Sequence, residues 1–223
     1  MIPIRDHNPS GKFSFITYLL IGLNILVLIW MLLISEAHLD GFLSLYALVP
    51  IEIVRGNNLT TLVTSIFLHG GIMHLAGNML FLYIFGDNLE DYFGHFKFLL
   101  FYLLSGLAAS GAQILVNPLS TIPMVGASGA IAGVMGGYLA LFPRHRIDVL
   151  FSFGFFLRQA TVPAFTMLFY WFVFQLLSGT GGLVLIDEAA GGVAYFAHIG
   201  GFAFGWAGTQ IFRRIKKDEN FLN

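Results

Sequence analysis

The chain of 223 residues contains no cysteine and few charged residues. The absence of cysteine excludes disulfides, thiol nucleophiles and thiolate metal sites. Charged side chains make up only 10% of the chain, whereas hydrophobic residues make up 57%. The net charge of −1 provides no basic surface for a nucleic acid. This composition is typical of a polytopic membrane protein, and the length allows about six or seven spans without a separate soluble domain.

Six apolar segments are candidates for crossing the bilayer, which takes about 20 helical residues. We expect a single all-α membrane domain over residues 1–223. Its predicted spans are about 13–34, 73–89, 98–116, 128–142, 162–178 and 193–212. Residues 36–68 have mixed polarity, which predicts a partly embedded first loop with short helices. Residues 1–12 read as a polar tail, and the short apolar stretch between Asp148 and Arg158 can lie in the membrane interface but cannot span.

The positive charges are distributed unevenly over this topology. Six crossings put both termini on the same side of the membrane. Of the 11 Lys and Arg residues, all except Arg55 fall on that side. The positive-inside rule therefore predicts a multi-pass protein of the cell membrane with both termini in the cytoplasm.

The fourth apolar segment is too short to cross the bilayer alone. From Ser128 to Phe142 there are 15 residues, or roughly 22 Å at ~1.5 Å per residue, against a hydrocarbon core of about 30 Å. The cations of residues 143–146 fix its far end at a membrane surface, so Ser128 should lie below the opposite, extracytoplasmic surface. Residues 117–127 must descend to it, which requires surrounding protein or a water-filled cavity.

Three histidines, His69, His74 and His198, lie at the extracytoplasmic ends of predicted spans, where polar side chains are candidates for function. His74 and Asn78 are four residues apart and so share one helix face. A serine hydroxyl becomes a useful nucleophile when a neighbouring histidine takes its proton. Because the carboxylates at the ends of the predicted spans, such as Glu90, read as loop or interface residues, a serine–histidine dyad is the simplest interpretation.

Small residues predict how the fourth and sixth spans pack. Gly129 and Gly133 form a small-residue stripe on the fourth span, while Gly201 and Gly205 share a face with His198 on the sixth. Stripes of this kind let two helices approach closely. Close packing of the two spans would bring His198 beside Ser128, whose position at a helix start leaves backbone N–H groups free for an oxyanion.

These segments carry a resemblance that covers essentially the whole chain. The motifs are HGGIMHLAGN (His69 to Asn78), GASG (Gly126 to Gly129) and AHIGGFAFG (Ala197 to Gly205), in that order. With them the chain resembles a rhomboid intramembrane serine protease of the compact six-span prokaryotic type.

The resemblance implies a role for each motif residue. Ser128 would be the nucleophile and His198 its general base. The oxyanion would be bound by His74, Asn78 and the backbone N–H of Ser128, with His69 and Gly126 supporting the same site. No cofactor or metal is implied. The substrates would be membrane-anchored proteins with an unstable transmembrane helix, cut near the extracytoplasmic face.

The sequence departs from the family pattern at two positions. The first loop of the family often carries a Trp-Arg pair, whereas here Arg55 stands without a tryptophan. The residue four after the nucleophile is aromatic in some members and packs on the histidine, whereas here it is Ala132. Another group must therefore hold His198.

Three other functions remain open. A small transporter would also place histidines and a broken helix inside the membrane, although the sequence has no convincing internal repeat. A metalloprotease could use the three histidines as ligands, but an HEXXH motif is absent. A catalytically inactive rhomboid-like binding protein would be expected to lack the serine or the histidine, and both are present.

Overall fold

The computed structural model describes residues 1–153, 156–184 and 193–222, and most of them are helical. The first half contains β1 (Ile2–Asp6), α1 (Phe15–Leu33), α2 (Glu36–Tyr46), α3 (Pro50–Val54), α4 (Thr61–Thr64), the 3-10 helix η1 (Ser65–Phe67) and α5 (Ile72–Phe93). The second half contains α6 (His95–Val116), α7 (Ser128–Leu141), β2 (Arg146–Phe153), β3 (Phe156–Pro163), α8 (Ala164–Val184) and α9 (Tyr195–Leu222). The segment that contains Asp187 and Glu188, which the sequence predicts to be a loop between the fifth and sixth apolar segments, lies outside the described residues.

The predicted apolar segments all coincide with helices. Within the described residues, α1 and α6 are each long and apolar enough to cross a membrane. A third candidate span combines the pair α4 and η1 with α5, which meet at a bend of 95°. Helix α7 (Ser128–Leu141) and the apolar part of α8 (Ala164–Thr180) are shorter. The helical membrane bundle agrees with the sequence analysis, whereas the number of six crossings stays a prediction.

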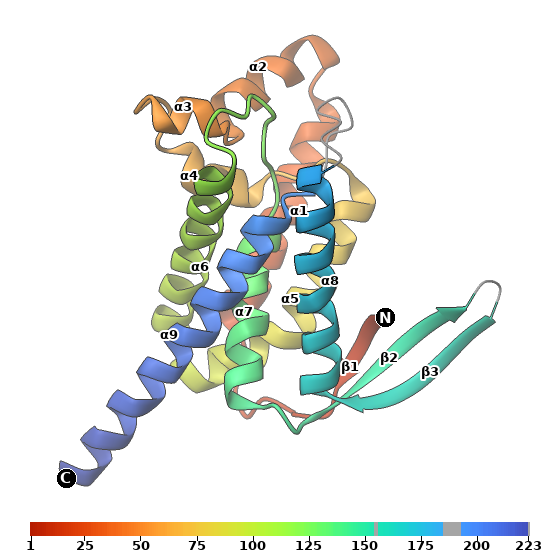
Figure 1. Cartoon of the computed structure of the whole chain (residues 1–223), viewed down its shortest axis with the longest axis vertical. Coiled ribbons are helices and arrows are strands. Elements are labelled where there is room, and N and C mark those ends of the chain that lie inside the picture. Colours follow the sequence, from red (N-terminus) through yellow and green to blue (C-terminus); the bar gives the residue numbers. More distant parts are fainter. Residues whose placement is uncertain (154–155, 185–192, 223) are drawn as a thin grey trace.

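Helix α7 occupies the centre of the bundle, where it contacts α5, α6, α8 and α9. The chain reaches α7 through residues 117–127, which run from the end of α6 down into the bundle (Figure 1). Backbone hydrogen bonds hold this segment: Met124 N donates to Leu48 O at 2.7 Å, and Gly126 N donates to Ser65 O at 3.0 Å. Irregular backbone inside the bundle is thus paired with protein, as its depth requires.

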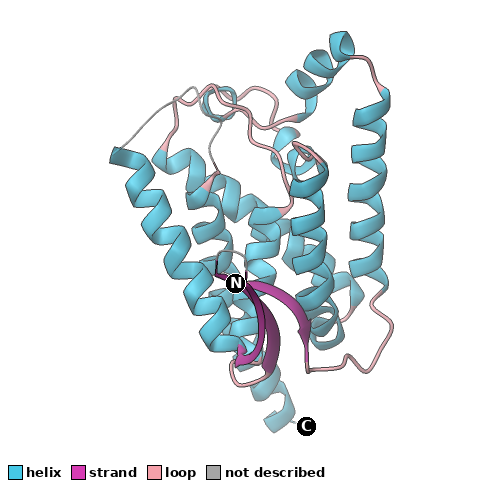
Figure 2. Ribbon diagram, turned by 90° about the vertical axis from the view of Figure 1, so that its right-hand side faces the viewer, coloured by secondary structure: helices cyan, strands magenta, loops and turns pink. Residues whose placement is uncertain are grey.

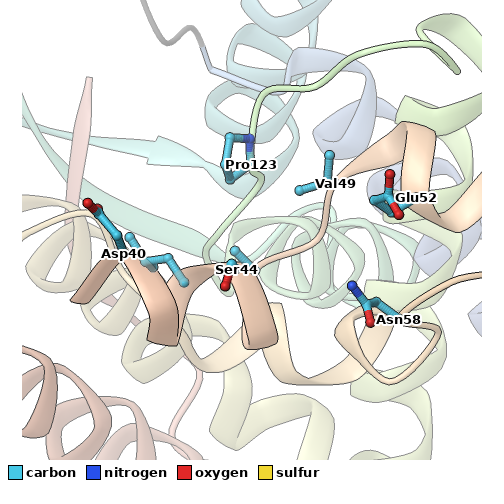
Figure 3. A pocket seen from close by; sticks show the side chains of 8 residues that line it. Asp40, Ser44, Val49, Glu52, Asn58 and Pro123 are labelled. Atoms are coloured by element: carbon cyan, nitrogen blue, oxygen red, sulfur yellow. The ribbon is translucent and has the colours of Figure 1, made fainter. Parts of the chain in front are cut away.

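Short helices form the predicted first loop at the end of the bundle where α6 stops (Figure 1). Between α2, α3 and residues 117–127 lies a cavity of about 350 Å³, lined among others by Asp40, Ser44, Glu52 and Pro123 (Figure 3). Arg55 donates to Glu52 at 3.0 Å, so this arginine is paired within its own loop. The cavity is a feature of the first loop and does not include Ser128.

The expectation of an all-α fold is wrong for two segments. β1, β2 and β3 form an antiparallel sheet in that order, with Ile2 opposite Leu150 and Arg146 opposite Pro163. The sheet lies beside the helices (Figure 2). Residues two apart in a strand share one face, and Ile147 and Val149 of β2 are fully buried in the hydrophobic core. Burial of this face explains why the sheet packs against the helices. Residues 1–12 are therefore more than a polar tail.

Asp148 joins the strands of this sheet. It accepts hydrogen bonds from Thr161 at 2.6 Å and His7 at 2.9 Å, and its other oxygen lies 3.7 Å from Arg5. The hydrogen bonds from Thr161 and His7 lower the pKa of Asp148 below its ordinary value. The carboxylate thus stays charged between the strands it links.

Glu90 also differs from its prediction as a loop or interface residue. It is only 2% exposed and accepts hydrogen bonds from Ile16 N at 2.8 Å and Thr17 N at 2.7 Å. The side chains of Thr17 and His95 contact it as well. Glu90 therefore caps the start of α1, where backbone N–H groups lack helical partners. It lies at the opposite end of α5 from His74 and takes no part in a triad with Ser128.

Candidate active site

Ser128 and His198 meet inside the bundle. Ser128 is the first residue of α7, and His198 lies in the first turn of α9. The distance from His198 Nε2 to Ser128 Oγ is 2.7 Å. His198 is 9% exposed, so the pair is largely shielded by protein. The two residues have the geometry of a nucleophile and its general base.

Glycine contacts bring the two helices this close. A Cβ on Gly201 would overlap the carbonyl oxygen of Gly129, and a Cβ on Gly205 would overlap that of Gly133. On their other sides, Gly129 and Gly133 pack against Ala109 and Ser105 of α6. The four glycines predicted as packing residues therefore pair as two contacts between α7 and α9.

Gln113 of α6 adds a polar contact at the start of α9. Its Oε1 accepts a hydrogen bond from Ala197 N at 3.2 Å. The same N–H also donates to Ala194 O at 3.0 Å, so the amide of Gln113 provides a second acceptor at the start of the helix. The contact fixes the residue directly before His198 to α6.

Two side chains of α8 hold the other side of the histidine. Gln175 Oε1 lies 2.9 Å from His198 Nδ1, and the Trp171 ring centroid lies 5.8 Å from that of His198. Ala132, where some family members have an aromatic residue, is buried but too small to support the ring. The sequence analysis missed both residues. Gln175 is the one amide in the apolar segment 162–178, and that signal could have identified it.

The predicted oxyanion residues gather beside Gly126, two residues before the nucleophile. A Cβ on Gly126 would lie 2.9 Å from the His74 ring and 3.7 Å from Asn78 Nδ2. The φ angle of Gly126 is +128°, a conformation that side chains rarely adopt. Both the angle and the contact with His74 require glycine here.

His69 completes this group. Its Nε2 lies 2.9 Å from Asn78 Nδ2, and its ring centroid is 5.1 Å from that of His74. His69 is almost fully buried, and Asn78 is 8% exposed. His69 thus contacts Asn78 and His74, not Ser128. The serine thus has a base in contact with its hydroxyl, and amide and imidazole groups lie beside Gly126, two residues before it.

Similar proteins are known from bacteria and plants. The rhomboid domain profile matches residues 56–215. RHOMBOID-like protein 6, mitochondrial, of Arabidopsis thaliana is 33% identical over 157 residues, which are 70% of this chain and 44% of that protein. Rhomboid protease GluP of Bacillus subtilis (strain 168) is 36% identical over 130 residues, 58% of this chain and 25% of that protein. Putative rhomboid protease YdcA of the same organism is 41% identical over 78 residues, 35% of this chain and 39% of that protein. The chain spans less than half the length of these relatives.

Proposed function

The chain belongs to the rhomboid family, and from this we propose that it is an intramembrane serine endopeptidase that uses Ser128 and His198. The observation that carries the proposal is the 2.7 Å contact between His198 Nε2 and Ser128 Oγ inside a helical bundle. Proximity of a base to a hydroxyl is what a serine nucleophile needs.

The reaction follows from these positions. Ser128 Oγ attacks the peptide carbonyl and transfers its proton to His198 Nε2, which then protonates the leaving amine. The backbone N–H of Ser128, with His74 and Asn78, donates to the oxyanion. Water then hydrolyses the acyl-enzyme, with His198 again acting as base. No cofactor takes part.

The substrates we propose are membrane-anchored proteins with an unstable transmembrane helix. A hydrogen-bonded helix shields its carbonyl groups, so only a segment that unwinds can reach Ser128. We place the protein in the cell membrane with cytoplasmic termini, which opens the site to the extracytoplasmic side.

Two alternatives receive less support. An inactive rhomboid-like binding protein has no need of a serine in hydrogen-bond contact with a histidine, and here the contact is present. A metalloprotease needs converging ligands, and no group of three or more His, Cys, Asp or Glu residues within the described part of the chain has that arrangement.

The test uses purified protein in liposomes with a model transmembrane substrate. Ser128→Ala, His198→Ala and the double variant should lose cleavage to a similar extent, because the effects of substitutions within one catalytic unit are not additive. A fluorophosphonate should label the wild type and not Ser128→Ala, and EDTA should leave cleavage unchanged. Cleavage by Ser128→Ala, or loss in EDTA that zinc restores, would overturn the mechanism.

A further inference from the structure

Both nitrogens of the His198 ring have a partner. Nε2 faces Ser128 Oγ at 2.7 Å, and Nδ1 faces Gln175 Oε1 at 2.9 Å. Gln175 is 6% exposed, so water does not compete freely for its amide. The group behind the histidine is therefore a neutral amide, and a carboxylate does not occupy this place.

The tautomer of His198 decides whether it can act as a base. A neutral imidazole carries one proton, and the nitrogen without the proton is the acceptor. To take the proton of Ser128, Nε2 must be free, which puts the ring proton on Nδ1. An amide oxygen accepts from Nδ1–H and so stabilises this tautomer. If the amide NH₂ faced Nδ1 instead, Nε2 would carry the proton and could not act.

We propose that Gln175 is a positioning residue that holds His198 in the Nδ1–H tautomer, leaving Nε2 free to accept the proton of Ser128. The inference rests on the proposed function and extends it to α8, a helix outside the family motifs. Gln175 contacts the ring nitrogen of His198 that does not face Ser128. It acts through the base, as the partner of a ligating or catalytic histidine does in other sites.

Trp171 supports the same ring from one turn earlier on α8. Residues four apart in a helix lie on one face, so Trp171 and Gln175 approach His198 together. The indole packs at a centroid distance of 5.8 Å and an angle of 37°, and it also packs on Phe202 of α9. Trp171 restricts the orientation of the imidazole plane, and Gln175 fixes the position of its Nδ1 atom. Trp171 and Gln175 of α8 thus support the His198 ring, which Ala132 of α7 is too small to do.

The expected effect is moderate because an amide is neutral. Loss of an orienting partner typically lowers function by about 10- to 100-fold. A buried Asp in the same place would also stabilise the imidazolium by its charge, and changing it to the amide lowers kcat by about 10⁴. Gln175 supplies orientation with only a dipole, so we expect the smaller range.

The key variant is Gln175→Met, which keeps the length of the side chain and replaces the amide by a weakly accepting thioether. It should lower kcat on the transmembrane substrate by about 10- to 100-fold with KM little changed. The rate of fluorophosphonate labelling of Ser128 should fall by the same factor. Gln175→Glu, which keeps an acceptor oxygen in either protonation state, should restore the labelling rate relative to Gln175→Met.

A matched control separates orientation from packing. Gln113→Met removes the amide that binds the backbone of Ala197, next to the histidine, without touching the ring. It should lower the melting temperature and leave the tautomer unchanged. Nitrogen NMR of histidine-labelled protein, with the His198 signals identified by their absence in His198→Ala, reports which ring nitrogen carries the proton.

The outcomes distinguish this inference from the proposed function. We expect protonated Nδ1 in the wild type and a mixed or reversed tautomer in Gln175→Met. A Gln175→Met protein with the wild-type tautomer and labelling rate would overturn the positioning role while leaving the dyad intact. A wild type that neither cleaves nor reacts with the fluorophosphonate would overturn the proposed function itself.

Discussion

At the scale of single residues, Asn78 and His74 differ in how they are held. Asn78 is buried and contacts His69 Nε2 at 2.9 Å, while the His74 side chain is exposed. An amide NH₂ has two hydrogens, so Asn78 can bond His69 with one and an oxyanion with the other. His69 would therefore act by orienting Asn78, which is consistent with its contact with that residue.

Truncation of the oxyanion donors is expected to lower the rate without unfolding the protein. Asn78→Ala and His74→Ala should each lower kcat by up to ~10²–10³, the effect of removing one such donor. The serine should still react measurably with a small electrophile, because the dyad is intact. Activity and melting temperature measured on the same purified samples check this.

The contrary result is also informative. If both variants lost melting temperature in proportion to activity, their hydrogen bonds would serve the fold, and the oxyanion role would have to be withdrawn. Asn78→Asp provides a control of similar shape, because a carboxylate accepts hydrogen bonds and cannot donate them to an oxyanion.

The residues that touch the reacting groups were easier to identify than those behind them. Ser128 stands at the start of a helix too short to span, and His198 lies among glycines, so depth and spacing both selected them. Gln175 and Trp171 lie in a segment without glycine pattern or motif. Their contact with His198 depends on how α8 rotates against α9, which no local periodicity determines.

At the scale of helices, the site depends on the contact between α7 and α9. The glycines of the two helices have no side chains to separate them, so the backbones of α7 and α9 are in direct contact. This close spacing places His198 within hydrogen-bond distance of Ser128. The sequence predicted this contact correctly from spacing alone. It did not predict that α6 would pack on the same glycines through Ser105 and Ala109, because those residues are common in many apolar helices.

Enlarging these glycines should affect fold and activity together. Gly201→Leu or Gly205→Leu would push α9 off the carbonyls of α7 and move His198 away from Ser128. Misplacement by about 1 Å can lower a rate 10²-fold, so activity should fall at least as far, together with the melting temperature. Thermal unfolding and cleavage assays on one sample measure both.

Gly208 offers a control on the same helix. A Cβ there would meet only Phe101, at 4.0 Å, which is ordinary contact. Gly208→Ala should therefore keep melting temperature and activity near those of the wild type. Equal losses in Gly208→Ala and Gly205→Leu would show that helix α9 tolerates no substitution of glycine, and the specific contact with α7 would lose its support.

The three-stranded sheet is the part of the fold that the lengths of the apolar segments did not predict. Residues 146–149 alternate polar and apolar residues, as a strand can, but this stretch is too short to be recognised among long apolar helices. One partner, β3, follows β2 directly in the chain, but the other, β1, lies far away because it precedes all the helices. Pairing at this sequence separation is set by the fold as a whole.

At the scale of the whole molecule, charge and apolar surface are arranged for a bilayer. Large apolar side chains such as Leu26, Trp30 and Leu33 of α1 are exposed outward. The start of α6, the end of α7 and the C-terminal end of α9 lie at one end of the bundle, and α2 and α3 lie at the other (Figure 1). Lys97, Arg144 and Arg213 therefore lie at the first end, and Arg55 lies at the second.

This asymmetry predicts the orientation of the protein, and the absence of cysteine makes it directly measurable. Thr60→Cys places a thiol at an exposed position near Arg55, and Gln159→Cys places one at an exposed position on β3. In intact cells of a bacterial host, a membrane-impermeant maleimide should label Thr60→Cys only, because the end rich in Lys and Arg stays in the cytoplasm. Permeabilised cells should show labelling of both.

Labelling of Gln159→Cys from outside would reverse the predicted orientation. Because Ser128 starts α7 on the side of the bundle where α2 and α3 lie, the site would then open toward the cytoplasm. In that case the same dyad would cut a transmembrane substrate near its cytoplasmic end. The orientation experiment therefore decides which end of a transmembrane substrate Ser128 can reach, independently of whether Ser128 is reactive.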